Sequence, residues 1–285
     1  MGVAFGLGAA VLWGLADYNA AVAARVTGSF RVVLGFHWLA VAGLAVIVAA
    51  TGALEGFDPA DLWKFAWVGA LGALSYVAFY KALEIGPISI LSPIVSAYAA
   101  VSLVLAVIVL DETLSGGQIA AVVVVMLGVL LASSDLRQMH AVGRRQALGL
   151  VLALVTVLAI GAFVFGNAYY AIEYGWLVPL FLGRGFAAVL LSAVALRSGS
   201  WRFPDRSPSL LARIALLAAV DTGGYVIFNV GAERAETSVV SAASAPYSVI
   251  PIVMGVLVLG ERPVLAQWLG IAGVVGGVVL LGLTS

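Results

Sequence analysis

The chain has 285 residues, of which 63% are apolar and 10% are charged, and its formal net charge is zero. Soluble domains average roughly 45–50% apolar and about 25% charged residues, so the composition excludes a soluble fold. The balanced charge gives no sign of nucleic-acid binding, for which a basic stripe is expected. The absence of cysteine excludes disulfides and thiolate metal sites.

Apolar stretches near the ~20 residues that a helix needs to cross a bilayer follow one another along the whole chain. Glycine, proline and polar residues separate them, as at Thr27-Gly28-Ser29 and Ser115-Gly116-Gly117. We therefore predict an all-α integral membrane protein with ten transmembrane helices, at residues 2–24, 32–51, 62–83, 88–110, 118–134, 147–170, 177–196, 210–231, 238–259 and 266–284.

The last third of each half repeats at a constant offset of 149 residues, which indicates an internal duplication. The repeated pairs include Tyr76 and Tyr225, Glu84 and Glu233, Ser92 and Ser241, Tyr98 and Tyr247, and Gly128 and Gly277. We assign a first five-helix repeat to residues 1–134, a connecting loop to 135–146 and a second five-helix repeat to 147–285. Because five is odd, the second repeat is inverted, and inverted repeats place a substrate site near the membrane midplane where they meet.

Lysine and arginine residues are distributed unevenly between the two sides of this ten-helix arrangement. Lys64 and Arg234 fall on the side of the termini, and Arg184 falls inside a helix. The positive-inside rule would make the other side cytoplasmic and put both termini outside. That side holds eleven of the fourteen: Arg25, Arg31, Lys81, Arg137, Arg144, Arg145, Arg197, Arg202, Arg206, Arg213 and Arg262.

Two copies of one motif lie in register within this plan. The first is Leu110-Asp111-Glu112-Thr113-Leu114 followed by Gln118, and the second is Leu259-Gly260-Glu261-Arg262-Pro263 followed by Gln267. With Trp13-Gly14 in the first helix, they make the chain resemble the drug/metabolite transporter (DMT) superfamily and its EamA-type members over essentially its whole length. The resemblance implies a carrier of small metabolites such as amino acids in a bacterial inner membrane. It also implies cytoplasmic termini, against the charge count, and the family usually has Gly where Asp111 stands.

Asp17, His37, Arg184 and Asp221 lie several residues from any predicted helix end. A charge at the bilayer centre costs roughly 2.5–3.5 kcal/mol, so such groups usually face a cavity or a partner. Arg184 could anchor a substrate carboxylate, or it could be the buried counter-ion of Asp17 or Asp221. His37 could relay protons or serve as an ordinary hydrogen-bond donor. Protons are thus a candidate coupling ion.

Aromatic and amide side chains supply flat surfaces with polar tips for a substrate, although each could instead be a packing residue. Glu112 and Glu261 are expected to accept hydrogen bonds from their turn and from the start of the following helix. Gln118 and Gln267 belong to the same motif, and Pro93, Pro246 and Pro251 are expected to kink helices. The predicted substrate-binding set is Trp13, Asp17, Tyr18, His37, Tyr76, Tyr80, Arg184, Asp221, Tyr225, Asn229 and Tyr247.

Duplication, size and intramembrane charges together favour a secondary active transporter, working as an exporter by alternating access around a central cavity. An alternative is efflux of cationic drugs or quaternary amines, bound by Asp17 and Asp221 among aromatic rings. A channel and a membrane-embedded enzyme are the rival classes. No ring of charges, nucleotide-binding loop, His-Glu-x-x-His or Gly-x-Ser-x-Gly occurs in the sequence, so neither an enzyme nor a cofactor is expected. The partners are a small molecule and the lipid bilayer, and a monomer already contains both halves.

Overall fold

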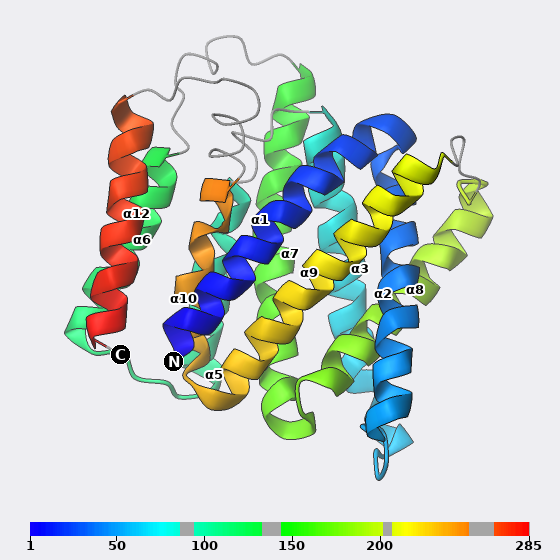
Figure 1. The fold of residues 1–285 in the computed structure, drawn as a ribbon, viewed down its shortest axis with the longest axis horizontal. Coiled ribbons are helices and arrows are strands. Elements are labelled where there is room, and N and C mark those ends of the chain that lie inside the picture. The colour runs from blue at the N-terminus through cyan, green and yellow to red at the C-terminus, as the bar shows by residue number, and fades with distance from the viewer. Residues whose placement is uncertain (86–93, 133–143, 202–206, 251–264, 285) are drawn as a thin grey trace.

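The computed structural model describes residues 1–85, 94–132, 144–201, 207–250 and 265–284, and these residues form helices joined by short connections (Figure 1). The prediction of an all-α membrane fold is confirmed. The first repeat contains α1 (Gly2–Thr27), α2 (Ser29–Thr51), the 3-10 turn η1 (Pro59–Asp61), α3 (Leu62–Ile85), α5 (Tyr98–Val109) and α6 (Gly116–Ala132). The second contains α7 (Arg144–Tyr174), α8 (Leu177–Ser198), α9 (Pro208–Arg234), α10 (Thr237–Ser244), the 3-10 turn η3 (Ala245–Ser248) and α12 (Leu265–Thr284).

The helices end where the sequence supplies stop signals. Gly52 after α2 and Gly199 after α8 both adopt the left-handed conformation, with φ of 66° and 68°, which glycine reaches without a steric penalty. They are equivalent in the two repeats, 147 residues apart. At the start of α9, the Ser207 hydroxyl accepts a hydrogen bond from the Leu210 backbone N–H, and Pro208 occupies the first helical position.

Within the described residues, six helices are long and apolar enough to cross a membrane, namely α1, α2, α3 with its preceding turn, α7, α8 and α9. Shorter apolar helices cover Ile94–Val109, Gly116–Leu131 and Trp268–Thr284. The predicted ninth span departs from a continuous helix in its described part, because α10 stops at Ser244 and η3 follows. We had expected Pro246 inside an α-helix, but it lies in that 3-10 turn. Proline suits the start of a new turn better than a helix interior.

The two repeats pack against each other in a symmetric pattern (Figure 1). Helix α1 packs along α9, and its counterpart α7 packs along α3. In the same way α2 contacts α9 while α8 contacts α3. The pairs α2 with α8 and α6 with α12 join equivalent helices. Exchanging the repeats therefore reproduces the contacts, as expected of two halves related by a pseudo-two-fold axis.

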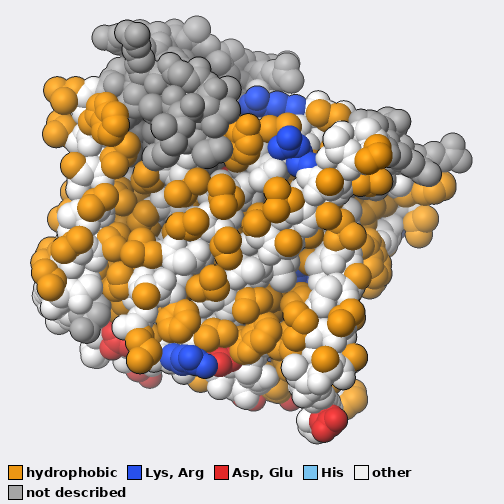
Figure 2. Space-filling model, viewed as in Figure 1, with side chains coloured by type: hydrophobic (Ala, Val, Ile, Leu, Met, Phe, Trp, Pro, Cys, Tyr) orange, Lys and Arg blue, Asp and Glu red, His pale blue; other side chains and the backbone are white. Residues whose placement is uncertain are grey.

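The two ends of the helical bundle differ in charge. Both termini lie at one end (Figure 1), and Figure 2 shows acidic side chains gathered there beside one basic side chain, with further basic side chains at the opposite end. A broad apolar belt separates them on the visible face, as a lipid-exposed surface requires. The described acidic residues at the end with the termini are Glu55, Asp58, Asp61, Asp111, Glu112, Glu173, Glu233 and Glu236.

Candidate functional site

A small cavity lies between the two repeats. Three of its walls come from α1, α3 and α5 of the first repeat, and three from the equivalent elements α7, α9 and η3 of the second. The space open to the centre of a water molecule is about 20 Å³, enough for about one water. The lining residues are Trp13, Asp17, Tyr76, Phe79, Tyr98, Ile160, Val164, Asp221, Tyr225 and Tyr247.

Close glycine contacts establish which lining residues are equivalent. A Cβ on Gly14 of α1 would lie 2.7 Å from the Tyr247 carbonyl oxygen, and a Cβ on Gly161 of α7 would lie 2.9 Å from the Tyr98 carbonyl oxygen. Tyr98 and Tyr247 are repeat partners, so Gly14 and Gly161 are partners as well, 147 residues apart. The first helices of the two repeats therefore align at an offset of 147, and the third and fourth helices at 149.

This register divides the cavity wall into a symmetric and an asymmetric part. Tyr76 pairs with Tyr225, and Tyr98 with Tyr247, so both repeats contribute the same phenols. Trp13 corresponds to Ile160, Asp17 to Val164 and Asp221 to Gly72. A Cβ on Gly72 would lie 2.8 Å from the Phe163 ring, so an aromatic ring fills the space beside α3. The acidic residues consequently lie on the α1 and α9 side only.

An ion pair lies behind the tyrosines. Arg184 of α8 pairs through Nη2 with Asp221 of α9, and both residues are buried. The Tyr76 hydroxyl donates to both carboxylate oxygens, at 2.8 and 3.0 Å, and accepts from Arg184 at 3.4 Å. Asp221 lines the cavity, whereas Arg184 is absent from its lining. The sequence offered Asp17 or Asp221 as the counter-ion of Arg184, and the structure shows the ion pair with Asp221.

Aromatic rings enclose the Arg184 guanidinium. Its central carbon lies 5.2 Å from the ring centroids of Phe36 and Tyr225 and 5.3 Å from that of Tyr76. Its Nε and Nη1 groups have no hydrogen-bond partner among the described residues, and the ring faces supply cation–π stabilisation instead. Arg184 therefore joins α8 to α2, α3 and α9, and so connects the two repeats.

His37 is the repeat equivalent of Arg184, and it is also buried outside the cavity. Its Nδ1 donates to the Val33 carbonyl at 2.8 Å, because a carbonyl can only accept. Its ring packs edge-on against Tyr76, with centroids 5.3 Å apart. In this conformation His37 supports the orientation of Tyr76.

The predicted binding set divides into two groups. Trp13, Asp17, Tyr76, Asp221, Tyr225 and Tyr247 line the cavity, and Tyr18, His37, Tyr80, Arg184 and Asn229 do not. Tyr80 packs against Phe36 and Tyr76, and the Asn229 side chain donates to the Trp176 carbonyl at 3.2 Å. The prediction omitted four lining residues, Phe79, Tyr98, Ile160 and Val164.

The motif residues have structural contacts at the acidic end. The Glu112 carboxylate accepts from the backbone N–H groups of Thr237 and Ser238 at 2.8 and 2.9 Å. We had expected Glu112 to accept hydrogen bonds from the helix that follows it. It instead caps α10 of the other repeat. Gln118 accepts from the Ser115 N–H at 2.7 Å, and its own N–H donates to the Ser115 hydroxyl at 3.2 Å, which is a capping box. Glu261, Pro93, Pro251 and the Gln267 side chain lie outside the described residues.

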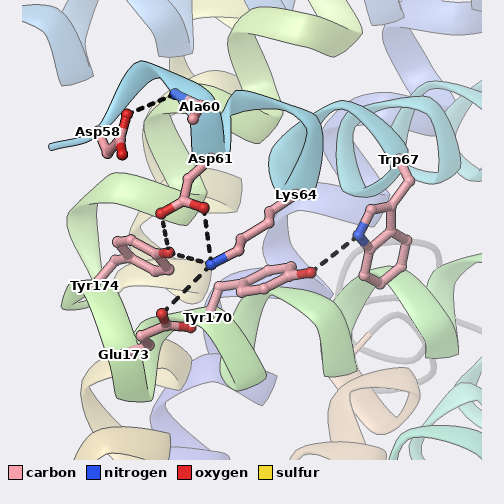
Figure 3. A network of polar contacts seen from close by, with 8 residues as sticks. All are labelled: Asp58, Ala60, Asp61, Lys64, Trp67, Tyr170, Glu173 and Tyr174. Carbon is pink, nitrogen blue, oxygen red and sulfur yellow. Dashed lines mark hydrogen bonds and ion pairs between the residues drawn. The ribbon is translucent and has the colours of Figure 1, made fainter.

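A second polar network joins the start of α3 to the end of α7 (Figure 3). Lys64 Nζ lies 3.0 Å from Asp61 Oδ1, 3.5 Å from Glu173 Oε1 and 2.5 Å from the Tyr174 hydroxyl. Tyr174 in turn donates to Asp61 at 2.6 Å. One turn farther along α3, the indole of Trp67 donates to the Tyr170 hydroxyl at 3.2 Å. The network tethers the two repeats at the acidic end.

Comparison with known proteins adds a family and a fold. A model described as the EamA-like transporter family matches residues 1–134 and 147–283. A solved structure described only as "Crystal structure of protein" is similar with a TM-score of 0.77, covering 99% of this chain and 96% of its own at 15% sequence identity. At that identity the likeness shows the fold alone. No curated protein matches the sequence.

Proposed function

Because the chain belongs to the EamA-like transporter family, we propose that it is a secondary active transporter that moves a small molecule by alternating access. The observation that carries this proposal is the cavity at the repeat interface, lined by equivalent elements of both repeats. Inverted repeats allow two conformations in which the halves exchange roles, so that one site opens first to one side of the membrane and then to the other.

The size of the cavity fits an intermediate of such a cycle. A space of about 20 Å³ accepts about one water molecule and no metabolite. Substrate therefore enters only after helices of the two repeats separate. The contacts that must change include those between α1 and α9 and between α3 and α7, the helices of the two repeats that pack together beside the cavity.

The substrates that we propose are small metabolites such as amino acids, exported across a bacterial inner membrane. Family membership supports this class. An amino acid also has two complementary groups near the cavity, Asp17 for its ammonium and Arg184 for its carboxylate. Arg184 would first have to separate from Asp221, whereas Asp17 already lines the cavity. The geometry thus makes the ammonium contact the more direct one.

Counterflow in proteoliposomes tests the transporter proposal. Vesicles preloaded with members of a panel of amino acids, amines and sugars are diluted into the same labelled compound, with and without a pH gradient. We expect wild-type protein to accumulate label transiently for at least one class. Val164→Trp should abolish exchange, because Val164 is 1% exposed and lines the cavity. Val189→Trp is the matched control, since Val189 is 60% exposed on α8.

The outcomes separate the classes of function. The Val164→Trp protein should still elute as a single species. If it does and exchange is intact, the cavity is not the transport site. Uptake without counterflow would indicate a channel, and chemical conversion of a panel member would indicate an enzyme. A stimulatory effect of the pH gradient would support proton coupling.

A further inference from the structure

We propose that a small polar solute travels between the cavity and the acidic end along the contact between α5 and α10, where buried hydroxyl groups face each other. The proposal rests on the transporter function proposed above and adds a route to it. The two helices lie against each other (Figure 1), and α10 begins at the acidic end, directly after Glu236. We call the buried hydroxyls along this contact the hydroxyl seam, which consists of Tyr98, Ser102, Thr237, Ser238, Ser241 and Ser244.

Hydrogen bonds across the seam hold α5 against α10. The hydroxyl oxygens of Ser102 and Ser241 lie 2.9 Å apart, and those of Tyr98 and Ser244 lie 2.8 Å apart. Ser244 donates its own proton to the Ser241 carbonyl at 2.7 Å, so Tyr98 is the donor of the bond to Ser244. Because Tyr98 also lines the cavity, the seam extends from the cavity toward the acidic end. In this conformation it is closed.

The two seam hydroxyls at the start of α10 have no partner. Thr237 Oγ1 and Ser238 Oγ are buried and form no hydrogen bond with any described residue. The backbone N–H groups of the same two residues are satisfied, because both donate to the Glu112 carboxylate. Burying a hydroxyl without a partner costs free energy. These hydroxyls therefore find their partners, water or a polar solute, in a conformation in which α5 and α10 have separated.

Hydroxyl groups also join helices inside membranes without lining any route, and the sequence of the other repeat bears on this alternative. Three of the six seam positions have an apolar residue at the equivalent position. The offset of 149 residues gives the pairs Thr237 and Ile88, Ser244 and Val95, and Ser102 and Pro251. Half of the hydroxyls are therefore particular to the side of the protein that faces the acidic end, and two of the six form no bond that would join helices.

Cysteine accessibility tests whether the seam opens, because the chain has no cysteine and cysteine is close to serine in size. Ser102→Cys and Ser241→Cys are treated in detergent with a positively charged methanethiosulfonate, which does not enter an apolar interior. Ser75→Cys is the matched control, since Ser75 is equally buried and donates to the Gly72 carbonyl of its own helix. We expect both seam variants to react at least about tenfold faster than the control, because opening of the route admits water and reagent.

A disulfide across the seam tests whether this opening is needed for transport. The double variant Ser102→Cys/Ser241→Cys places two thiols where the hydroxyl oxygens are 2.9 Å apart. Oxidation with copper phenanthroline should abolish counterflow of the amino acids, amines or sugars that the wild type exchanges, and dithiothreitol should restore it. The two single-cysteine variants are the controls, and the oxidant should leave their exchange unchanged.

Removal of the unpartnered hydroxyls separates a route from a purely structural seam. Thr237→Val and Ser238→Ala delete groups that form no hydrogen bond with the described residues in this conformation, so neither should lower thermal stability. We expect counterflow to slow about threefold or more in each variant, because the open route loses a hydroxyl that contacts water or solute. A purely structural seam predicts an unchanged rate.

The results distinguish failure of the route from failure of the transporter proposal. Labelling of Ser241→Cys no faster than that of Ser75→Cys, or counterflow that survives the disulfide, would overturn the route and leave the transporter proposal intact. Unchanged counterflow in both Thr237→Val and Ser238→Ala would overturn it as well. Absence of counterflow of every compound in the wild type would count against the transporter proposal, and the labelling rates alone would then decide whether the seam opens.

Discussion

The two ends of the helical bundle use the same structural position in different ways. Lys64 in the first turn of α3 and Arg213 in the second turn of α9 are repeat equivalents, 149 residues apart. Lys64 contacts Asp61, Glu173 and Tyr174 at the acidic end (Figure 3). Arg213 donates to the Asn19 side-chain oxygen at 3.2 Å at the basic end. Each cation reaches the first helix of the other repeat, α7 or α1.

The difference shows what the duplication kept and what it changed. Both repeats kept a cation that joins their third helix to the first helix of the partner repeat. The acidic end surrounds its lysine with two carboxylates and a phenol, whereas Arg213 donates to a neutral amide, Asn19, that itself donates to the Leu15 carbonyl. An alternating-access cycle must break each tether in turn, so we infer that opening toward the acidic end costs more.

The largest effect that we expect concerns which end faces the cytoplasm. The basic end should be cytoplasmic, because these connections are short enough for the positive-inside rule to apply. The chain contains no cysteine, so single cysteines report position directly. Glu55→Cys at the acidic end should react with a membrane-impermeant maleimide in intact spheroplasts, and Ser198→Cys at the basic end should react only after lysis.

Two results would contradict this orientation. Labelling of Ser198→Cys alone in intact spheroplasts would reverse it and place the termini in the cytoplasm, as the family resemblance implies. Equal labelling at both positions would show that the protein inserts in both directions. Introducing lysines at Glu55 and Asp58 should shift the result toward the reverse orientation if charge is the cause.

The next effect concerns the tether at the acidic end. Lys64→Ala should raise the labelling rate of a cysteine at the lining position Ile160 by about 5- to 30-fold. The network is partly exposed, with side-chain exposures of 20% for Lys64 and 28% for Asp61. Its contribution should therefore lie between those of an exposed and a buried ion pair. Lys64→Arg keeps the charge and should change the labelling rate little. An unchanged labelling rate in Lys64→Ala would show that the network does not hold the cavity closed.

A smaller effect is expected at the basic end. Arg213→Ala removes the hydrogen bond to Asn19, for which a net contribution of about 0.5–1.5 kcal/mol is usual. The labelling rate of the cysteine at position 160 should then change by about 2- to 10-fold. Asn19→Ala and the double variant complete a double-mutant cycle. Fully additive effects would show that the two side chains do not act through each other.

The fold could be predicted in some detail because the bilayer imposes its length on each helix. Hydropathy located α1, α2, α3, α7, α8 and α9 to within a few residues, and the 149-residue offset identified the duplication. Pro246 indicated a kink in the ninth span, but hydropathy did not show that the α-helix ends at Ser244 and a 3-10 turn follows. A helix interrupted by a 3-10 turn has the same composition as a continuous one when the turn is buried in protein.

The site could be predicted in part, since charged and aromatic residues are conspicuous in apolar sequence. Asp17 and Tyr225 were identified in this way, and Tyr98 could have been found as the repeat partner of Tyr247. Ile160 and Val164 carry no such signal, because hydropathy does not separate a side chain that faces a cavity from one that faces lipid. The partner of Arg184 depends on how α1, α8 and α9 are rotated about their axes, and the sequence left both Asp17 and Asp221 open.

The smallest effect that we expect concerns the turn that begins the motif at the acidic end. Asp111 has a φ of 53°, in the left-handed region that costs a residue with a Cβ roughly 1 kcal/mol. Its repeat equivalent is Gly260, the residue type usual in the family at this position. Asp111→Gly should therefore raise the free energy of unfolding by about 0.5–1 kcal/mol, measured by denaturant titration in detergent. Asp111→Ala keeps the Cβ and should not stabilise the protein. If both substitutions have the same effect, the aspartate carboxylate and not the backbone conformation governs this turn, which would explain why the first repeat differs from the second here.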